Sequence, residues 1–145
     1  MQSDKAAFKP SDKVTRENIK EMVANFYAKV REHRNLSPIF KKFIGKSETA
    51  WDEHIELIAD FWATRIINDG GYEGRPLFKH IKMPHFPRER FTDWLALFES
   101  ALSEAYTPQA AEPFLAMARG MAQRFQSVMY DGVRVEDLPP PQHKK

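Results

Sequence analysis

The chain has 145 residues, with 22 Lys and Arg, 20 Asp and Glu, and no cysteine. A domain of this length can bury about two thirds of its unfolded surface without disulfides, and the missing thiols exclude zinc ribbons, iron–sulfur clusters and cysteine catalysis. The net charge is +2 and both signs are mixed along the chain, without the basic stripe typical of a nucleic-acid or membrane-surface protein.

The first 14 residues are polar and show little periodicity, which predicts a loosely ordered lead-in. They contain no apolar signal core, and no run of 18 apolar residues occurs in the chain. We therefore expect a soluble, cytoplasmic protein that binds neither a membrane nor a nucleic acid.

The first amphipathic helix is expected to begin after Thr15, whose side chain can cap it. Its apolar residues repeat at helical spacing, and they are Ile19, Met22, Val23, Phe26 and Val30. Tyr27 lies four residues after Val23, so its ring falls on or beside this apolar stripe. A buried tyrosine usually finds a hydrogen-bond partner. Tyr27 is therefore either a residue at the edge of the core or a polar group directed into a site.

Two further helices are predicted before residue 70. Ser37 and Pro38 predict the cap and first turn of a short apolar helix that includes Phe40, and Gly45 ends it. Ser47 caps the next helix, in which the apolar stripe consists of Trp51, His54, Ile55, Ile58, Trp62 and Ile66. His54 is therefore expected inside an apolar face that also contains two tryptophans.

The segment of residues 76–87 is too short for a structural helix and too apolar for an ordinary loop. Its prolines bound about two helical turns, in which Leu77, His80 and Ile81 share one face. His80 is thus expected on an apolar face. It is either a core histidine bonded to a backbone carbonyl or an axial ligand to a metal or haem.

Two more amphipathic helices are predicted after this segment. The first buries Phe91, Trp94, Leu95, Phe98, Leu102 and Ala105. The second follows Thr107 and Pro108, and Pro113 predicts an irregular start or a kink in it. Residues 132–145 form a Pro-rich, polar tail that we expect to be flexible and to add nothing to the domain. No segment alternates with period two, so the protein is predicted to be all-helical.

Only two of the five histidines, His54 and His80, lie on predicted apolar faces. Two histidines from separate elements can lie on opposite sides of a flat cofactor. Glu-x-x-His pairs, His-Glu-x-x-His, Gly-x-Ser-x-Gly and a P-loop are all absent, which argues against a di-iron bundle, a zinc protease, a serine hydrolase and a P-loop nucleotidase. A haem protein and a cofactor-free helical domain both remain open on these patterns.

Five short motifs then occur in a specific order between residues 15 and 131. They are Phe26-Tyr27, Pro38-Ile39-Phe40, Trp51-x-x-His54 with Phe61-Trp62, Pro76-Leu77-x-x-His80 with Pro84-x-Phe86-Pro87, and Trp94-Leu95-x-Leu97-Phe98. Together they resemble the group III truncated haemoglobins. The resemblance implies an all-α truncated globin domain over residues 15–131, a two-over-two helical sandwich around haem b, with the lead-in and the tail outside it.

The resemblance also implies roles for individual residues. The cofactor pocket would consist of His80, Phe40, His54, Trp62 and Trp94. His80 matches the proximal iron ligand of the family, and His54 its distal histidine. Tyr27 and Trp94 match its distal polar residues, so the ligand-binding side would contain Tyr27, His54 and Trp94. No catalytic residue is assigned beyond these.

The resemblance implies binding of oxygen, nitric oxide or a similar small ligand, because a single histidine leaves one position of a haem iron open. Tyr27 and Trp94 can donate hydrogen bonds to such a ligand, while His54 either bonds it or gates the pocket. Several donors in a dry pocket favour redox chemistry, such as nitric oxide dioxygenase-like or peroxidase-like activity with a reductase, over transport. A haem-based gas sensor and a partner-binding helical module are the alternatives.

Overall fold

The computed structural model describes residues 10–72 and 86–138. All regular elements in these ranges are helical: α2 (Arg16–Glu32), α3 (Ser37–Ile44), α4 (Glu48–Ile67), α6 (Glu89–Ala105), α7 (Pro108–Met129) and the 3-10 helix η1 (Val135–Asp137). The all-helical prediction is confirmed. None of the described helices is long and apolar enough to cross a membrane.

Side-chain caps begin three of the helices. In α2, Thr15 Oγ1 accepts from the backbone N–H of Asn18 at 3.1 Å, and Asn18 Oδ1 accepts from the backbone N–H of Thr15 at 2.9 Å. This reciprocal pair satisfies two of the N–H groups that a helix start leaves without intrahelical partners. Ser47 and Thr107 cap α4 and α7. The predicted caps at Thr15 and Ser47 are confirmed.

The start of α3 differs from the prediction by one residue. Ser37 is already helical, and the cap position is occupied by Leu36, which has no side-chain cap bond. The turn before α3 is instead held by His33, because its Nδ1 accepts from the backbone N–H groups of Asn35 at 3.1 Å and Leu36 at 3.3 Å. Gly45 ends the helix as predicted, with φ at +116°, a value that favours glycine.

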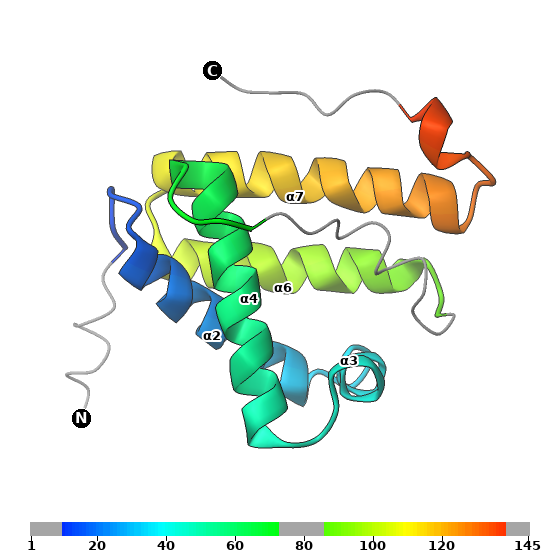
Figure 1. Ribbon diagram of the computed structural model, residues 1–145, viewed down its shortest axis with the longest axis horizontal. Helices are drawn as coiled ribbons and strands as arrows, with labels where there is room; N and C mark the ends of the chain where they lie inside the picture. Colours follow the sequence, from blue (N-terminus) through cyan, green and yellow to red (C-terminus); the bar gives the residue numbers. More distant parts are fainter. Residues whose placement is uncertain (1–9, 73–85, 139–145) are drawn as a thin grey trace.

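The four long helices form two packed pairs, α2 with α4 and α6 with α7 (Figure 1). α6 and α7 run antiparallel, and α2 packs against both α6 and α4. The short α3 lies next to α2 and to the beginning of α4. Helix α7 continues through Pro113 as one α-helix, so the irregularity predicted there does not divide it.

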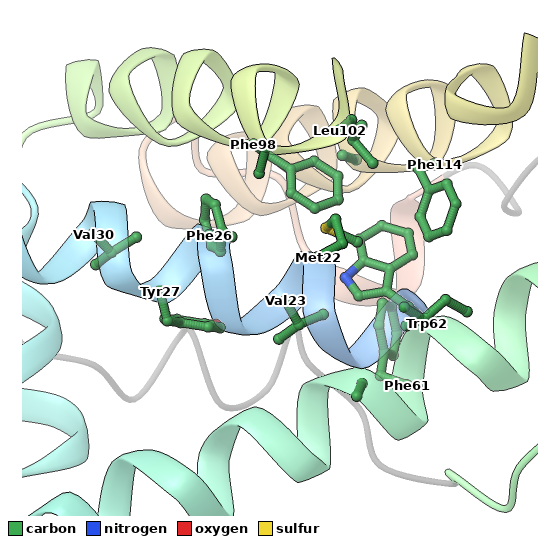
Figure 2. Close-up of a cluster of buried hydrophobic side chains, with 14 of the residues drawn as sticks. Met22, Val23, Phe26, Tyr27, Val30, Phe61, Trp62, Phe98, Leu102 and Phe114 are labelled. Atoms are coloured by element: carbon green, nitrogen blue, oxygen red, sulfur yellow. The ribbon is translucent and has the colours of Figure 1, made fainter. Parts of the chain in front are cut away.

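The main core lies where these pairs meet and is rich in aromatic rings (Figure 2). Trp62 stacks on Phe98, with ring centroids 5.1 Å apart, and contacts Phe114 at 5.4 Å. Phe98 in turn stacks on Trp94 at 5.5 Å. Such ring pairs add about 0.5–1.5 kcal/mol each beyond the area that they bury. The stack therefore fixes α6 against α4 and α7.

The described part of the lead-in is anchored to the domain. The backbone N–H of Ser11 donates to the carbonyl of Ala105 at 2.9 Å, and that of Thr107 donates to the carbonyl of Ser11 at 3.0 Å. Val14 also packs on the core. Residues 10–14 thus contact the junction of α6 and α7, whereas we expected a loose segment. Residues 1–9 lie outside the described part.

The beginning of the tail also contacts the domain, which differs from our expectation. Gly132 has φ at +76°, and the chain turns there so that the N–H of Val133 donates to the carbonyl of Ser127 at 3.0 Å. Val135 and Leu138 then pack against a second apolar cluster, which consists of Phe86, Phe91, Ala122 and Phe125. Residues of α3, α6 and α7 also pack against this cluster, so the segment after α7 shares in covering it. Residues 139–145 lie outside the described part.

Candidate functional site

A mainly apolar cavity lies among α2, α3, α4, α6 and α7. Its apolar walls include Phe40, Phe43, Phe86, Phe91, Met121 and Phe125. Its polar or partly polar side chains are Tyr27, His54, Arg90 and Trp94. Tyr27, Phe40, His54 and Trp94, which come from four different helices, were all expected in one pocket from the sequence, and the structure brings them together.

Tyr27 and His54 interact directly at this cavity. The Tyr27 hydroxyl oxygen lies 3.0 Å from Nε2 of His54, and the rings meet edge to face with centroids 5.0 Å apart. Tyr27 is only 4% exposed, and this burial raises the pKa of its phenol well above the ordinary value. Tyr27 therefore keeps its proton at physiological pH and remains a hydrogen-bond donor.

The ring of Tyr27 is held by other aromatic residues. It meets Phe26 at 4.9 Å, Phe40 at 6.0 Å and Trp51 at 6.1 Å, all edge to face. Trp51 is itself fixed, because its Nε1–H donates to the carbonyl of Gly45 at 2.9 Å. These contacts restrict the two side-chain torsions of Tyr27, so its hydroxyl group has a defined position beside His54.

Trp94 lines the same cavity from α6. Its ring stacks on Phe98 at an interplanar angle of 13° and meets Phe26 edge to face at 6.0 Å. The structure shows no hydrogen bond from its indole N–H within residues 10–72 and 86–138. Trp94 is thus a rigid side chain in the cavity wall whose indole Nε1–H can donate a hydrogen bond to a bound molecule.

Arg90 also lines the cavity, one helical turn before Trp94. Its Nη1 lies 3.3 Å from Oδ2 of Asp93, and this carboxylate also accepts from Asn35 Nδ2 at 3.4 Å. Nε of Arg90 is buried and has no hydrogen-bond partner, the single such side-chain atom in the described part of the chain. The wall therefore offers an unsatisfied N–H donor of a guanidinium, which suits an acceptor such as a carboxylate on a bound molecule.

Sequence reasoning did not select Arg90, although a signal was present. Arg90 precedes Trp94 by four residues, so the two share one face of α6. Trp62, in contrast, was expected to contact the cofactor in part. The structure places it in the core against Phe98, Phe61 and Phe114 (Figure 2). Trp62 is not among the described residues that line the cavity.

The proposed iron ligand His80 lies in residues 73–85, outside the described part of the chain, as does His85. The structure describes the chain again from Phe86, whose carbonyl accepts from the Tyr130 hydroxyl at 2.5 Å. Arg88, two residues after Phe86, binds both carboxylate oxygens of Asp131, at 2.8 and 3.1 Å. The end of α7 thus holds the chain at the point where Phe86 enters the cavity wall.

Comparisons with known proteins agree with the resemblance seen in the sequence. No family model matches the chain. It is 39% identical over 117 residues to the group 3 truncated hemoglobin ctb of Campylobacter jejuni, which covers 81% of this chain and 92% of that protein. The crystal structure of a group III truncated hemoglobin from Campylobacter jejuni superimposes with a TM-score of 0.82 at 37% identity, covering 86% of this chain and 98% of that chain.

Proposed function

Because the chain belongs to the group III truncated haemoglobins, we propose that it holds haem b in the cavity, with His80 as the iron ligand, and binds oxygen or nitric oxide there. We further propose that it carries out redox chemistry on these ligands with electrons from a reductase, rather than transport. The observation that carries the proposal is the convergence of Tyr27, His54 and Trp94 on one apolar cavity.

The described walls suit a haem. A porphyrin is a flat apolar ring with two carboxylates, and the cavity offers phenylalanines such as Phe40 and Phe91 for the ring and the buried Nε–H of Arg90 for a carboxylate. His80 would supply the imidazole from residues 73–85. When bound, haem supplies an iron with an open coordination position and one-electron chemistry.

The distal residues have distinguishable roles in this proposal. Tyr27 keeps its proton and can donate to a diatomic ligand while its oxygen accepts from Nε2–H of His54. Trp94 donates from a ring that stacks on Phe98. His54 therefore orients Tyr27 in the first place, and moves toward a ligand only if it gives up this hydrogen bond.

The number of donors supports redox chemistry over transport. A hydrogen bond to a charged acceptor contributes roughly 1.5–3 kcal/mol, which corresponds to about ten- to a hundred-fold in a dissociation rate. Donors from both Tyr27 and Trp94 would slow the release of oxygen. A protein that retains oxygen is poorly suited to deliver it, but it can expose it to nitric oxide.

The proposal is tested with the purified full-length chain loaded with haem. A Soret band should appear, and the oxygenated protein should consume nitric oxide rapidly in stopped flow and yield nitrate. Tyr27→Phe serves as the variant and Tyr72→Phe, outside the cavity lining, as its control. If haem binds but neither nitric oxide nor peroxide is turned over, the redox assignment is wrong.

A gas sensor is the second candidate, and one observation favours it. Val135 and Leu138 pack on a cluster that includes Phe86, Phe91 and Phe125, which also line the cavity. A ligand that shifts this wall would therefore disturb the segment after α7. Hydrogen exchange of residues 133–138 that changes on carbon monoxide binding would support the sensor.

A further inference from the structure

The stretch of residues 34–47 contains four cations and no acidic residue. The cations are Arg34, Lys41, Lys42 and Lys46, and we call them the basic cluster. Because the whole chain has a net charge of only +2, the rest of the sequence is net negative. Positive charge is therefore concentrated on α3 and the turns on either side of it.

The basic cluster is not neutralised by neighbouring side chains. All four cations are exposed, and the structure gives none of them an ion pair within the described residues. Cations of α2, in contrast, are paired, as in Arg31 with Glu48 at 2.8 Å and Lys29 with Glu104 at 3.0 Å. A charge that has a partner contributes little to the field at a distance, so the basic cluster dominates the potential near α3.

The basic cluster also lies beside the cavity. The same stretch supplies Ile39, Phe40 and Phe43 to the cavity wall. Phe43 is 41% exposed and is one of two exposed large hydrophobic residues in the described part of the chain. It is adjacent in sequence to Lys42 and two residues from Lys41. An exposed aromatic ring of the cavity wall therefore lies next to unpaired cations.

We propose that the basic cluster and Phe43 form the docking surface for an acidic electron-donor protein. The inference rests on the proposed redox function, which requires an electron source. In each encounter the donor would lose one electron and a ferric haem held in the cavity would gain it, with no bond made or broken. The location is suitable because the surface adjoins the cavity, so a docked donor lies close to the cofactor.

The charge and the size of this surface favour an acidic electron-donor protein as the partner. Opposite charges raise association rates by about 10- to 1,000-fold, and electron-transfer complexes use small interfaces of less than about 1,200 Å². Four cations around one exposed ring match an acidic surface of that size. A nucleic acid or membrane would be expected to engage a longer basic stripe or helix than the eight residues of α3.

The test measures reduction of the ferric holoprotein under carbon monoxide in stopped flow. One donor is a reduced flavodoxin, a small acidic flavoprotein, and the other is reduced lumiflavin, which needs no docking surface. The variant is Lys41→Glu/Lys42→Glu. Its control is Lys13→Glu/Arg119→Glu, which changes the net charge equally at exposed positions outside the basic cluster.

We expect reduction of the wild type by flavodoxin to slow at least tenfold between about 50 and 500 mM salt, because the Debye length shortens from about 14 to 4 Å. At low salt the cluster variant should be at least tenfold slower than wild type and the control within about twofold. Lumiflavin should reduce all three proteins at similar rates.

The possible failures are distinguishable. A missing Soret band would overturn the haem proposal itself. Normal lumiflavin rates with equal flavodoxin rates in cluster variant and control would overturn the docking surface alone. Loss of binding to phosphatidylserine vesicles in the cluster variant, with unchanged flavodoxin kinetics, would assign the surface to a membrane instead.

Discussion

The hydroxyl group of Tyr27 belongs to a ring that is almost fully buried, and its partner in the structure is Nε2 of His54. A buried hydroxyl without a partner costs about 1–3 kcal/mol. Removing the His54 imidazole therefore leaves the Tyr27 hydroxyl without this partner, and a cavity ligand can take its place. The two residues act as a unit, so variants of them have to be compared as a set.

We predict that Trp94→Phe and Tyr27→Phe each change the oxygen dissociation rate about ten- to a hundred-fold, because each removes a donor worth roughly 1.5–3 kcal/mol. His54→Leu should change this rate less and mainly alter ligand entry, since the imidazole is engaged by Tyr27. The measurement is oxygen displacement from the ferrous protein by carbon monoxide. A dominant effect of His54→Leu would show that His54 itself holds the ligand.

The iron ligand is predicted to be His80. Replacement by Ala should abolish the five-coordinate ferrous spectrum, and added imidazole should restore it, because the free ligand can occupy the space of the lost ring. Both histidines of residues 73–85 are tested by absorption and resonance Raman spectra. If His85→Ala loses the spectrum and His80→Ala keeps it, the register of the resemblance is wrong.

At the scale of elements, the end of α7 is bonded to the chain before α6 by Tyr130 and by the pair Arg88–Asp131. Arg88 also lies over the ring of Tyr130, 5.4 Å from its centroid, and donates to Gln126 Oε1 at 3.1 Å. These contacts hold Phe86 in the cavity wall. The proper positioning of this wall thus depends on side chains far from it in sequence.

Tyr130→Phe should lower the free energy of unfolding by about 1 kcal/mol, because it removes the hydrogen bond to the Phe86 carbonyl. This corresponds to about 3 °C in Tm for a domain of this size. Thermal unfolding of the haem-free chain measures the effect. Tyr72→Phe is the control, since the structure gives its hydroxyl no hydrogen bond in the described residues. Equal shifts in both variants would contradict the role of the bond.

The ion pair at this junction predicts a pH dependence. The Arg88 guanidinium lowers the pKa of Asp131 below its ordinary value of 3.8. A lowered folded-state pKa contributes stability above the unfolded value that is lost as the pH falls through the folded value. The Tm difference between wild type and Asp131→Asn should therefore be constant at neutral pH, shrink as the pH falls below 3.8, and vanish once Asp131 is protonated in the folded protein as well. A difference that persists in strong acid would mean that Asp131 acts through another contact.

The helices were predictable because their signals are local. Thr15 and Ser47 each cap a helix directly before its apolar stripe, so the start of the helix is predicted without any residue distant in sequence. An apolar stripe predicts which face of a helix is buried, but not which other helix each turn of that face contacts. The sequence therefore could not show that, on the same helix, Trp62 lies in the core and His54 at the cavity. Arg90 was not predicted for another reason. An arginine beside an apolar face usually packs its aliphatic stem there and keeps its guanidinium in solvent.

At the scale of the whole molecule, the comparisons and the structure agree on a truncated globin with the predicted two-over-two helix pairs. The cavity draws its walls from five helices, so its shape depends on the complete domain. The second apolar cluster extends this dependence to residues after α7. We predicted that the domain ends at residue 131. Val135 and Leu138 lie beyond that boundary and still pack on apolar side chains of the domain.

The last prediction concerns this segment. Val135 and Leu138 cover the cluster of Phe86, Phe91 and Phe125, so deleting residues 133–145 should expose apolar surface and cost about 2 kcal/mol, or about 5 °C in Tm. Deleting residues 139–145 keeps both side chains and is the matched control, with an expected change within about 1 °C. Thermal unfolding and the rate of haem transfer to apomyoglobin are measured on both. Because the same phenylalanines line the cavity, the longer deletion should also speed haem loss. If both truncations behave like the full chain, residues 133–138 do not stabilise the domain, and the sensor candidate loses its structural basis.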